Sequence, residues 1–182
     1  MADFTSEEIE AIVSTGTLKK VAAKTKVFQA DKPFTKLWFL QEGLVRAYRI
    51  VNGQDFTFFF FTKQEFAVDY QSFLTEETST LLFDTLADTT YWEFSKSAIL
   101  KLYKNYPRFE RVGRIMAEEA YLSATERLKE FQTASLEERY KKLLSKDPEL
   151  FQQIPQYHIA SYLGVKPQSL SRLRAKLTGK RY

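Results

Sequence analysis

The sequence predicts an α+β protein with three parts: an N-terminal double-stranded β-helix of jelly-roll type, one long helix, and a C-terminal all-α helix-turn-helix. Most of its sixteen Phe and ten Tyr residues precede residue 110, in short apolar runs separated by turn residues. Aromatic side chains of this kind favour strands. The segment 107–131 has no glycine except Gly113 and no proline after Pro107, which favours a single long helix. We place two domains, at residues 1–133 and 134–182.

Composition narrows the possible classes of protein. A chain of 182 residues with 44% hydrophobic residues is long enough for a packed core. It contains no cysteine, which excludes disulfides, thiolate catalysis, Cys-ligated zinc and iron–sulfur clusters. Its one histidine is His158, and we expect that side chain to face solvent or a phosphate. No apolar run approaches the length of a membrane span and the first twenty residues lack a signal pattern, so we expect a cytoplasmic protein that does not bind membranes.

The β-rich part is expected between a short helix at 5–13, capped by Thr5 or Ser6, and a second helix at 95–103, capped by Ser95. Asn52-Gly53 is the strongest hairpin signal, because both residues accept positive φ, and Gly43 marks another turn. We expect the aromatic run 56–61 to fill the interior of the β-roll. The predicted strands cover residues 27–28, 37–40, 44–51, 56–61, 81–86 and 91–94.

The long helix is predicted to form the seam of a two-fold dimer. Its apolar stripe is wide enough to face both its own domain and a second copy. The simpler alternative is a helix buried only against its own domain. A short helix at 136–144 follows, and Asp147-Pro148 separates it from the helix-turn-helix. The stripe comprises Phe109, Val112, Met116 and Ala120.

The segment 156–175 has the residue types of a helix-turn-helix at the required spacing. Ala160 supplies the small contact between the helices, and Gly164 accepts positive φ in the turn. Pro167 suits the first turn of the second helix, where its missing N–H would have had no intrahelical partner. The buried spine comprises Ile159, Leu163, Val165, Leu170 and Leu173.

The second helix, predicted at 167–177, carries side chains suited to reading DNA. Its base-reading candidates are Gln168, Ser169, Ser171 and Arg172, because arginine pairs with guanine and glutamine with adenine. Its candidate phosphate contacts are Lys166, Arg174, Lys176 and Lys180. From residue 166 onwards the chain has six basic residues and no acidic one, which favours a phosphate backbone. The alternative is a two-helix packing element with a solvated basic tail.

The order of these parts resembles that of the Crp/Fnr superfamily of bacterial transcription regulators, over about residues 5–178. The segment 37–46 is similar to the family's early strand pair around a glycine, and Tyr106-Pro107 is similar to the entry of its dimerisation helix. The specific match is 154–177, which follows the pattern I-A-x-x-L-G-[ILV]-x-x-x-[ST]-[LV]-S-R. The resemblance implies a cyclic-nucleotide-binding-like β-roll, a homodimer and double-stranded DNA as partner. RNA polymerase is a further candidate partner.

The cassette that holds a cyclic nucleotide in such relatives is degenerate here. Those relatives carry G-E-x-x and, after a short helix, R-[ST]-A. Between Gln64 and Ser95 the chain has seven acidic residues and no Lys or Arg. Because an arginine–phosphate contact contributes about 1.5 to 3 kcal/mol, we expect no cyclic AMP binding. We predict no cofactor, and the sequence does not identify any other effector. The matching residues are Val68, Asp69, Tyr70, Thr78 and Ser79.

The reading helix also departs from the family pattern. Many relatives open it with Ser-Arg-Glu-Thr, whereas this chain has Lys-Pro-Gln-Ser at 166–169, so its target sequence should differ. Only five residues follow Leu177, which is too short for the β-hairpin wing of many relatives.

Two other classes of protein are alternatives to a DNA-binding regulator. A cupin-type enzyme needs two or three metal-ligating histidines, and a single histidine in the helix-turn-helix does not provide them. No Gly-rich phosphate loop, catalytic triad or HExxH motif occurs, so we predict that the chain is not an enzyme. The other alternative is a β-roll that senses a small ligand or binds a protein, with little sequence-specific DNA binding.

Overall fold

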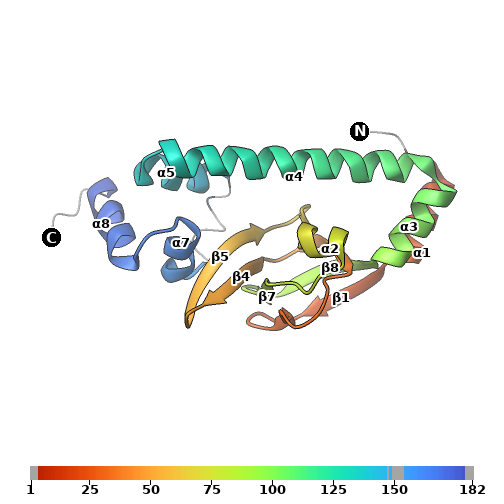
Figure 1. Cartoon of the computed structure of the whole chain (residues 1–182), viewed down its shortest axis with the longest axis horizontal. Coiled ribbons are helices and arrows are strands. Elements are labelled where there is room, and N and C mark those ends of the chain that lie inside the picture. The colour runs from red at the N-terminus through yellow and green to blue at the C-terminus, as the bar shows by residue number, and fades with distance from the viewer. Residues whose placement is uncertain (1–3, 147, 149–153, 179–182) are drawn as a thin grey trace.

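The computed structural model describes residues 4–146, 148 and 154–178. Eight strands form a roll beneath one long helix, α4, and the C-terminal helices lie at the end of the roll opposite α1 and α3 (Figure 1). The described helices are α1 Ser6–Thr15, α2 Tyr70–Thr75, α3 Lys96–Asn105, α4 Pro107–Thr133, α5 Leu136–Lys146, α7 Gln156–Tyr162 and α8 Pro167–Leu177. The strands are β1 Thr17–Val21, β2 Lys26–Phe28, β3 Lys36–Glu42, β4 Val45–Val51, β5 Gln54–Phe61, β6 Phe66–Ala67, β7 Leu82–Thr85 and β8 Thr89–Ser95.

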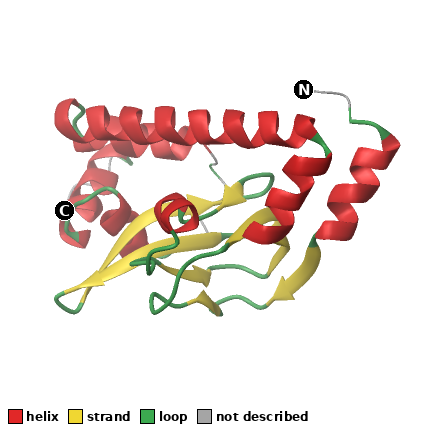
Figure 2. Cartoon of the chain, turned by 45° about the vertical axis from the view of Figure 1, so that its right-hand side comes forward, coloured by secondary structure: helices red, strands yellow, loops and turns green. Residues whose placement is uncertain are grey.

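The strands form two antiparallel four-stranded sheets, in the orders β1-β8-β3-β6 and β2-β7-β4-β5. This is the jelly-roll-like architecture that the sequence predicts, and the helices are segregated from it in the manner of an α+β fold (Figure 2). Asn52 and Gly53 have φ of 51° and 76°, so the hairpin predicted between β4 and β5 is confirmed. Gly43 has φ of 97°, and a Cβ there would meet the carbonyl oxygen of Asp88 at 2.5 Å. A glycine is therefore required at this turn.

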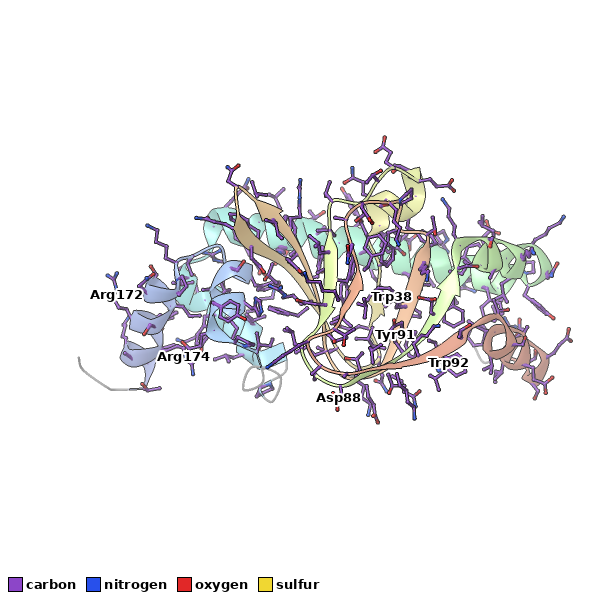
Figure 3. The ribbon with its side chains drawn as sticks, turned by 90° about the horizontal axis from the view of Figure 1, so that it is seen from below. Trp38, Asp88, Tyr91, Trp92, Arg172 and Arg174 are labelled. Atoms are coloured by element: carbon purple, nitrogen blue, oxygen red, sulfur yellow. The ribbon has the colours of Figure 1, made fainter. Side chains whose placement is uncertain are left out.

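The prediction that residues 56–61 fill the roll is wrong for most of that run. Phe56, Phe58 and Phe59 are exposed on β5, and Phe61 is the member that packs against the core of the roll. Rings from several other elements fill the interior instead. The ring of Phe34 lies 4.9 Å from that of Phe83 and 5.1 Å from that of Trp38. Trp38 and Tyr91 occupy the middle of the roll in Figure 3.

Two strands and one helix in the roll were not predicted. β1 is an edge strand whose residues are mostly exposed, so it lacks an alternating apolar pattern. β6 has two residues, and α2 has six, which is too short for a helical period to be recognised. These elements are too short or too exposed for a repeating pattern to indicate their conformation.

The predicted helix starts are confirmed by their caps. The side chain of Thr5 accepts a hydrogen bond from the backbone N–H of Glu8, and the carboxylate of Glu8 accepts one from the backbone N–H of Thr5, which forms a capping box. Ser95 caps α3 by a single bond, in which its hydroxyl accepts from the backbone N–H of Ala98 at 3.2 Å. α4 begins at Pro107 and continues for 27 residues to Thr133, so the long helix is present. The proposed domain boundary falls between α4 and α5.

The apolar stripe assigned to the dimer seam is divided in the structure. Phe109 is buried and stacks on Phe4 at 5.0 Å, so it leaves almost no surface for a second copy. Val112, Met116 and Ala120 are half-buried. The apolar side chains that α4 exposes lie elsewhere on the helix: Ile115, Tyr121, Leu122, Leu128 and Phe131.

The described helices include none that combines the length and the hydropathy needed to cross a bilayer. Among the described residues, no three or more His, Cys, Asp or Glu side chains are grouped so that they could hold a metal ion.

Candidate nucleic-acid interface

The turn between α7 and α8 is built by Gly164. Its φ is 68°, its N–H donates to the carbonyl of Ser161 at 3.0 Å, and the N–H of Val165 donates to the carbonyl of Ala160 at 3.0 Å. This pair of bonds ends α7 in a Schellman motif. A Cβ on Gly164 would meet the ring of Phe131 at 2.9 Å, so both the backbone angle and the contact require glycine.

The predicted spine holds the two helices together. Ile159, Ala160, Leu163 and Leu170 are buried in one apolar cluster with Tyr140 of α5, and Val165 and Leu173 pack against it. The same cluster includes Leu44, Phe60, Leu86 and Ala87 of the β-roll. The helix-turn-helix is therefore docked on the roll of its own chain and does not stand free of it.

One face of α8 leaves its two longest candidate base-reading side chains uncovered. Gln168 and Arg172 are exposed, and Ser169 and Ser171 are half-buried. An open hollow on this face is lined by Gln156, Pro167, Gln168, Ser171 and Arg172. Arg172 lies on α8 at the end of the molecule, far from the aromatic interior of the roll (Figure 3). α8 begins without a side-chain cap. Pro167 has no N–H and that of Ser169 donates to the carbonyl of Lys166 at 2.9 Å, so the N–H that the start of α8 can offer a phosphate is that of Gln168.

The candidate phosphate contacts differ in their surroundings. Lys166 is exposed, and Arg174 is half-buried on α8. Lys176 forms an ion pair with Glu137 of α5 at 3.1 Å, so it would have to exchange that partner for a phosphate. Lys180 lies outside the described residues.

The polar groups of the degenerate cassette bond to one another. The carboxylate of Asp69 accepts from the hydroxyl of Ser79 at 2.6 Å and from the backbone N–H of Ser72 at 3.3 Å. The hydroxyl of Ser72 accepts from the N–H of Phe34 at 2.8 Å, which ties the cassette to the aromatic interior. Asp69, Ser72 and Ser79 are all buried. The carboxylate that could have bound a ribose is thus used to cap α2 and to hold the 79–81 turn.

The other cassette residues offer little to a ligand. Val68 is buried in the core of the roll, and Tyr70 is half-buried against it. Thr78 is exposed and forms an isolated bridge to Pro33.

His158 does not face solvent, contrary to the prediction. Only 5% of its surface is exposed, and its Nδ1 lies 2.5 Å from Nη1 of Arg46 in β4. Burial first, and then the charge of Arg46, lower the pKa of His158 from 6.5 to about 4. The imidazole is therefore neutral at pH 7. Because Arg46 is 112 residues away in sequence, nothing near His158 in the chain indicates this contact.

Lowering the pH from 7 to 5 is expected to reduce the free energy of unfolding by about 1 to 2 kcal/mol through His158. The unfolded chain binds the proton near pH 6.5 and the folded chain near pH 4, so the unfolded state binds more protons between these values. The stabilisation is complete above pH 6.5 and is lost as the pH falls toward 4. Urea unfolding at pH 7, 6 and 5 tests this, with His158→Asn as the control that lacks an imidazole. Equal pH slopes in the two proteins would contradict it.

Residues 18–106 match the family described as cyclic nucleotide-binding domain. FixK2 from Bradyrhizobium japonicum superposes with a TM-score of 0.78 at 16% identity, over 91% of this chain and 85% of that one. A regulator of the Crp/Fnr family from Eubacterium rectale gives 0.74 at 14% identity, over 97% and 86%. The chain has the Crp/Fnr fold.

A third structure, the c-di-GMP-responsive global regulator CLP of Xanthomonas campestris, gives a TM-score of 0.75 at 18% identity, over 96% of this chain and 92% of that one. No curated protein matches the chain by sequence. The resemblance predicted from the 154–177 motif is therefore confirmed at the level of the Crp/Fnr fold, across both the roll and the helix-turn-helix.

Proposed function

We propose that the chain is a DNA-binding transcription regulator of Crp/Fnr type and acts as a homodimer on a roughly palindromic site. The observation that carries this proposal is the uncovered face of α8, with Gln168 and Arg172 exposed on a helix held by a Schellman turn. Two such helices would enter successive major grooves about 34 Å apart. The structural relatives that carry the same order of parts include regulators, which supports the assignment and argues against an enzyme.

The β-roll, in this proposal, does not respond to cyclic AMP. The carboxylate of Asp69 is bonded within the protein, and the segment 64–95 contains no Lys or Arg to neutralise a cyclic phosphate. Losing one arginine–phosphate contact costs about 1.5 to 3 kcal/mol, which is at least a tenfold loss of affinity. Aromatic rings also occupy the interior of the roll.

The homodimer is supported by apolar residues that α4 leaves exposed. Ile115 and Leu122 are seven residues apart, as are Tyr121 and Leu128, which is the spacing of a helix–helix seam. Tyr121 and Leu122 are 71% and 64% exposed in the single chain. Neighbouring apolar side chains with this much exposed surface mark a site where a second protein chain can bind.

Selection of the purified protein on a pool of random duplexes at physiological salt tests the function. We expect an enriched palindrome that is bound equally well with and without cyclic AMP. Binding that depends only on salt, with no enriched sequence, would instead favour a β-roll that senses a ligand or binds a protein.

Replacing Arg172 with alanine is expected to weaken binding to the enriched duplex by about 1 to 3 kcal/mol and to relax the preference at one base pair of each half-site, because a guanine contact would be lost. Arg174→Ala is the matched control: as a phosphate contact, it should weaken binding to all duplexes and reduce the salt dependence. Titration of both variants on matched and mismatched duplexes measures this. Unchanged site selection by Arg172→Ala would contradict the base-reading role.

A further inference from the structure

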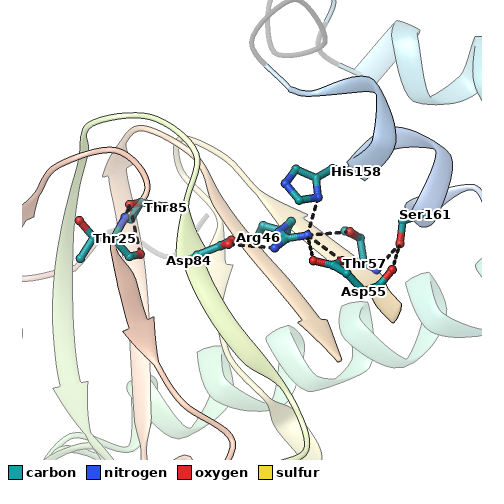
Figure 4. Close-up of polar contacts among 8 residues, drawn as sticks. All are labelled: Thr25, Arg46, Asp55, Thr57, Asp84, Thr85, His158 and Ser161. Carbon is teal, nitrogen blue, oxygen red and sulfur yellow. Dashed lines mark hydrogen bonds and ion pairs between the residues drawn. The ribbon is translucent and has the colours of Figure 1, made fainter. Parts of the chain in front are cut away.

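A buried arginine joins the β-roll to the helix-turn-helix. Arg46 is 3% exposed and lies in β4, with its Nε and Nη2 donating to Asp84 of β7 at 3.0 and 2.9 Å. Its Nη1 donates to both carboxylate oxygens of Asp55 in β5 at 2.8 and 2.7 Å. The same Nη1 lies 2.5 Å from His158 of α7, so the guanidinium, held by two carboxylates of the roll, reaches the first helix of the helix-turn-helix (Figure 4).

In the hydrogen bond between Arg46 and His158, the arginine is the donor. A guanidinium donates hydrogen bonds and accepts none, so Nδ1 of His158 must be the acceptor and the ring proton must be on Nε2. The charged groups facing the imidazole are Arg46 from β4, Asp55 from β5 and Asp84 from β7. Within its own helix the ring packs on Tyr157, at 4.0 Å between centroids. The buried guanidinium of Arg46 needs a hydrogen-bond acceptor on this side, and the neutral imidazole of His158 supplies one.

A second polar contact lies one turn further along the same face of α7. The hydroxyl of Ser161 accepts from the backbone N–H of Thr57 at 2.7 Å and donates to the carbonyl of Asp55 at 2.9 Å. His158 and Ser161 are three residues apart, so both project toward β5 from one side of the helix. Two anchored points prevent α7 from rotating about its own axis while it stays docked.

The far end of the same interface is held by Arg127 of α4. Its guanidinium donates to the carbonyls of Phe58 in β5 and of Tyr162 in α7, and lies 4.2 Å from the ring centroid of Tyr162. The ring of Tyr162 lies 5.3 Å from that of Phe60. The orientation of α7 is thus determined by residues of β4, β5 and α4, and α8 follows α7 through the Schellman turn.

We propose that Arg46 acts through His158 as a positioning residue, holding the helix-turn-helix on the β-roll in the orientation that reads DNA. The inference rests on the proposed function. The docked arrangement is assigned as the reading state because α8 keeps its base-reading face uncovered in it, with Gln168 and Arg172 exposed. Arg172 points away from the roll in Figure 3.

Loss of the contact would weaken DNA binding through a change in populations. If the helix-turn-helix samples several orientations, only the molecules in the reading orientation can bind. The apparent affinity is then the intrinsic affinity multiplied by the fraction of molecules in that orientation. A dimer incurs this loss at both half-sites. Binding to phosphates alone depends much less on orientation, so the ratio of specific to non-specific affinity should fall.

The test compares His158→Leu with His158→Asn, two side chains of similar shape. Asparagine can place an acceptor oxygen near the position of Nδ1, whereas leucine cannot. Ser161→Ala is a second variant with a small change in volume, and Ser14→Ala, an exposed serine of α1, is its matched control. Circular dichroism at 25 °C and the melting temperature establish that each variant is folded.

The first readout is the distance between the roll and the helix-turn-helix. Because the chain contains no cysteine, two spin labels can be attached uniquely at Lys19→Cys in β1 and Thr178→Cys after α8. Labelled chains are diluted with excess unlabelled chains so that only distances within one chain are measured. We expect one narrow distribution for the natural protein, His158→Asn and Ser14→Ala, and broader distributions for His158→Leu and Ser161→Ala.

The second readout is affinity for the enriched duplex and for an unrelated duplex. We expect His158→Leu to lose about tenfold in specific affinity, equivalent to about 1.4 kcal/mol, with non-specific binding unchanged. Identical distance distributions for His158→Leu and His158→Asn would overturn the positioning contact. Broadening without any loss of specific affinity would overturn its role in reading DNA. If the natural protein enriches no duplex, the proposed function fails, and the distances alone still decide whether an acceptor at position 158, bonded to Arg46, holds the helix-turn-helix on the roll.

Discussion

Arg46→Met is expected to lower the free energy of unfolding at pH 7 by about 2 to 4 kcal/mol, because it leaves two carboxylates facing each other at a partly buried site. Asp84 is 17% exposed and Asp55 is 37% exposed, so water can solvate the second more than the first. We therefore expect Arg46→Met to destabilise the protein less than breaking a fully buried ion pair would. The variant also removes the contact between the guanidinium and the ring of Tyr48, at 3.8 Å.

Urea unfolding measures this loss, with Arg49→Met as the matched control. Arg49 is half-buried on the same strand, and its replacement should cost less than 1 kcal/mol. Adding Asp84→Asn to Arg46→Met should recover part of the stability, because one of the uncompensated charges is removed. If both arginine variants unfold at the same urea concentration, the buried ion pairs do not stabilise the protein as described.

A double replacement on α4, Leu122→Glu with Leu128→Glu, is expected to make the protein monomeric and to weaken binding to the palindrome by about a hundredfold or more. Apposed glutamates of two copies would repel and could not be buried without cost. In a dimer the second half-site is bound intramolecularly, which raises overall affinity by about 10² to 10⁴. A monomer loses that advantage.

Sedimentation equilibrium and titration of the palindrome check this prediction together. The control is Leu18→Glu, an exposed leucine on β1, which lies on the side of the roll away from α4 (Figure 1). The control should remain dimeric and bind normally. A double variant that is still dimeric would mean that the seam lies on another face of the protein, and one that is monomeric but binds the palindrome undiminished would contradict the cooperative reading of two half-sites.

Much of the fold was predictable because its signals are local. Pro167 marks a helix start because it lacks an N–H. Gly164 and the Asn52-Gly53 pair mark turns because these residues accept positive φ. Each of these signals is a property of one or two residues. The caps Thr5 and Ser95 act over three residues. The short elements β1, β6 and α2 were missed because no local period distinguishes them from loops.

The exposed face of α8 could also be predicted from the sequence, since a regular helix places side chains by their spacing. Gln168 and Arg172, four residues apart, lie on one side of any helix that buries Leu170. The distribution of exposed residues along α4 was less accessible. Phe109 fits the apolar stripe, but whether its ring packs on Phe4 or on another chain depends on where α1 and the N-terminal residues lie.

The longer helices and strands, the turns at Gly43, Asn52-Gly53 and Gly164, and the residues that α8 presents could be predicted from the sequence, because each depends on backbone preferences within a few positions. Three features depend on the tertiary packing: which rings fill the roll, the bond between Asp69 and Ser79, and the contact of Arg46 with His158. The reason is physical: a buried polar group must find a partner, but any acceptor that the fold brings within about 3 Å can serve. Which residue that is depends on how β4 and α7 pack, and no pattern within either segment contains that information.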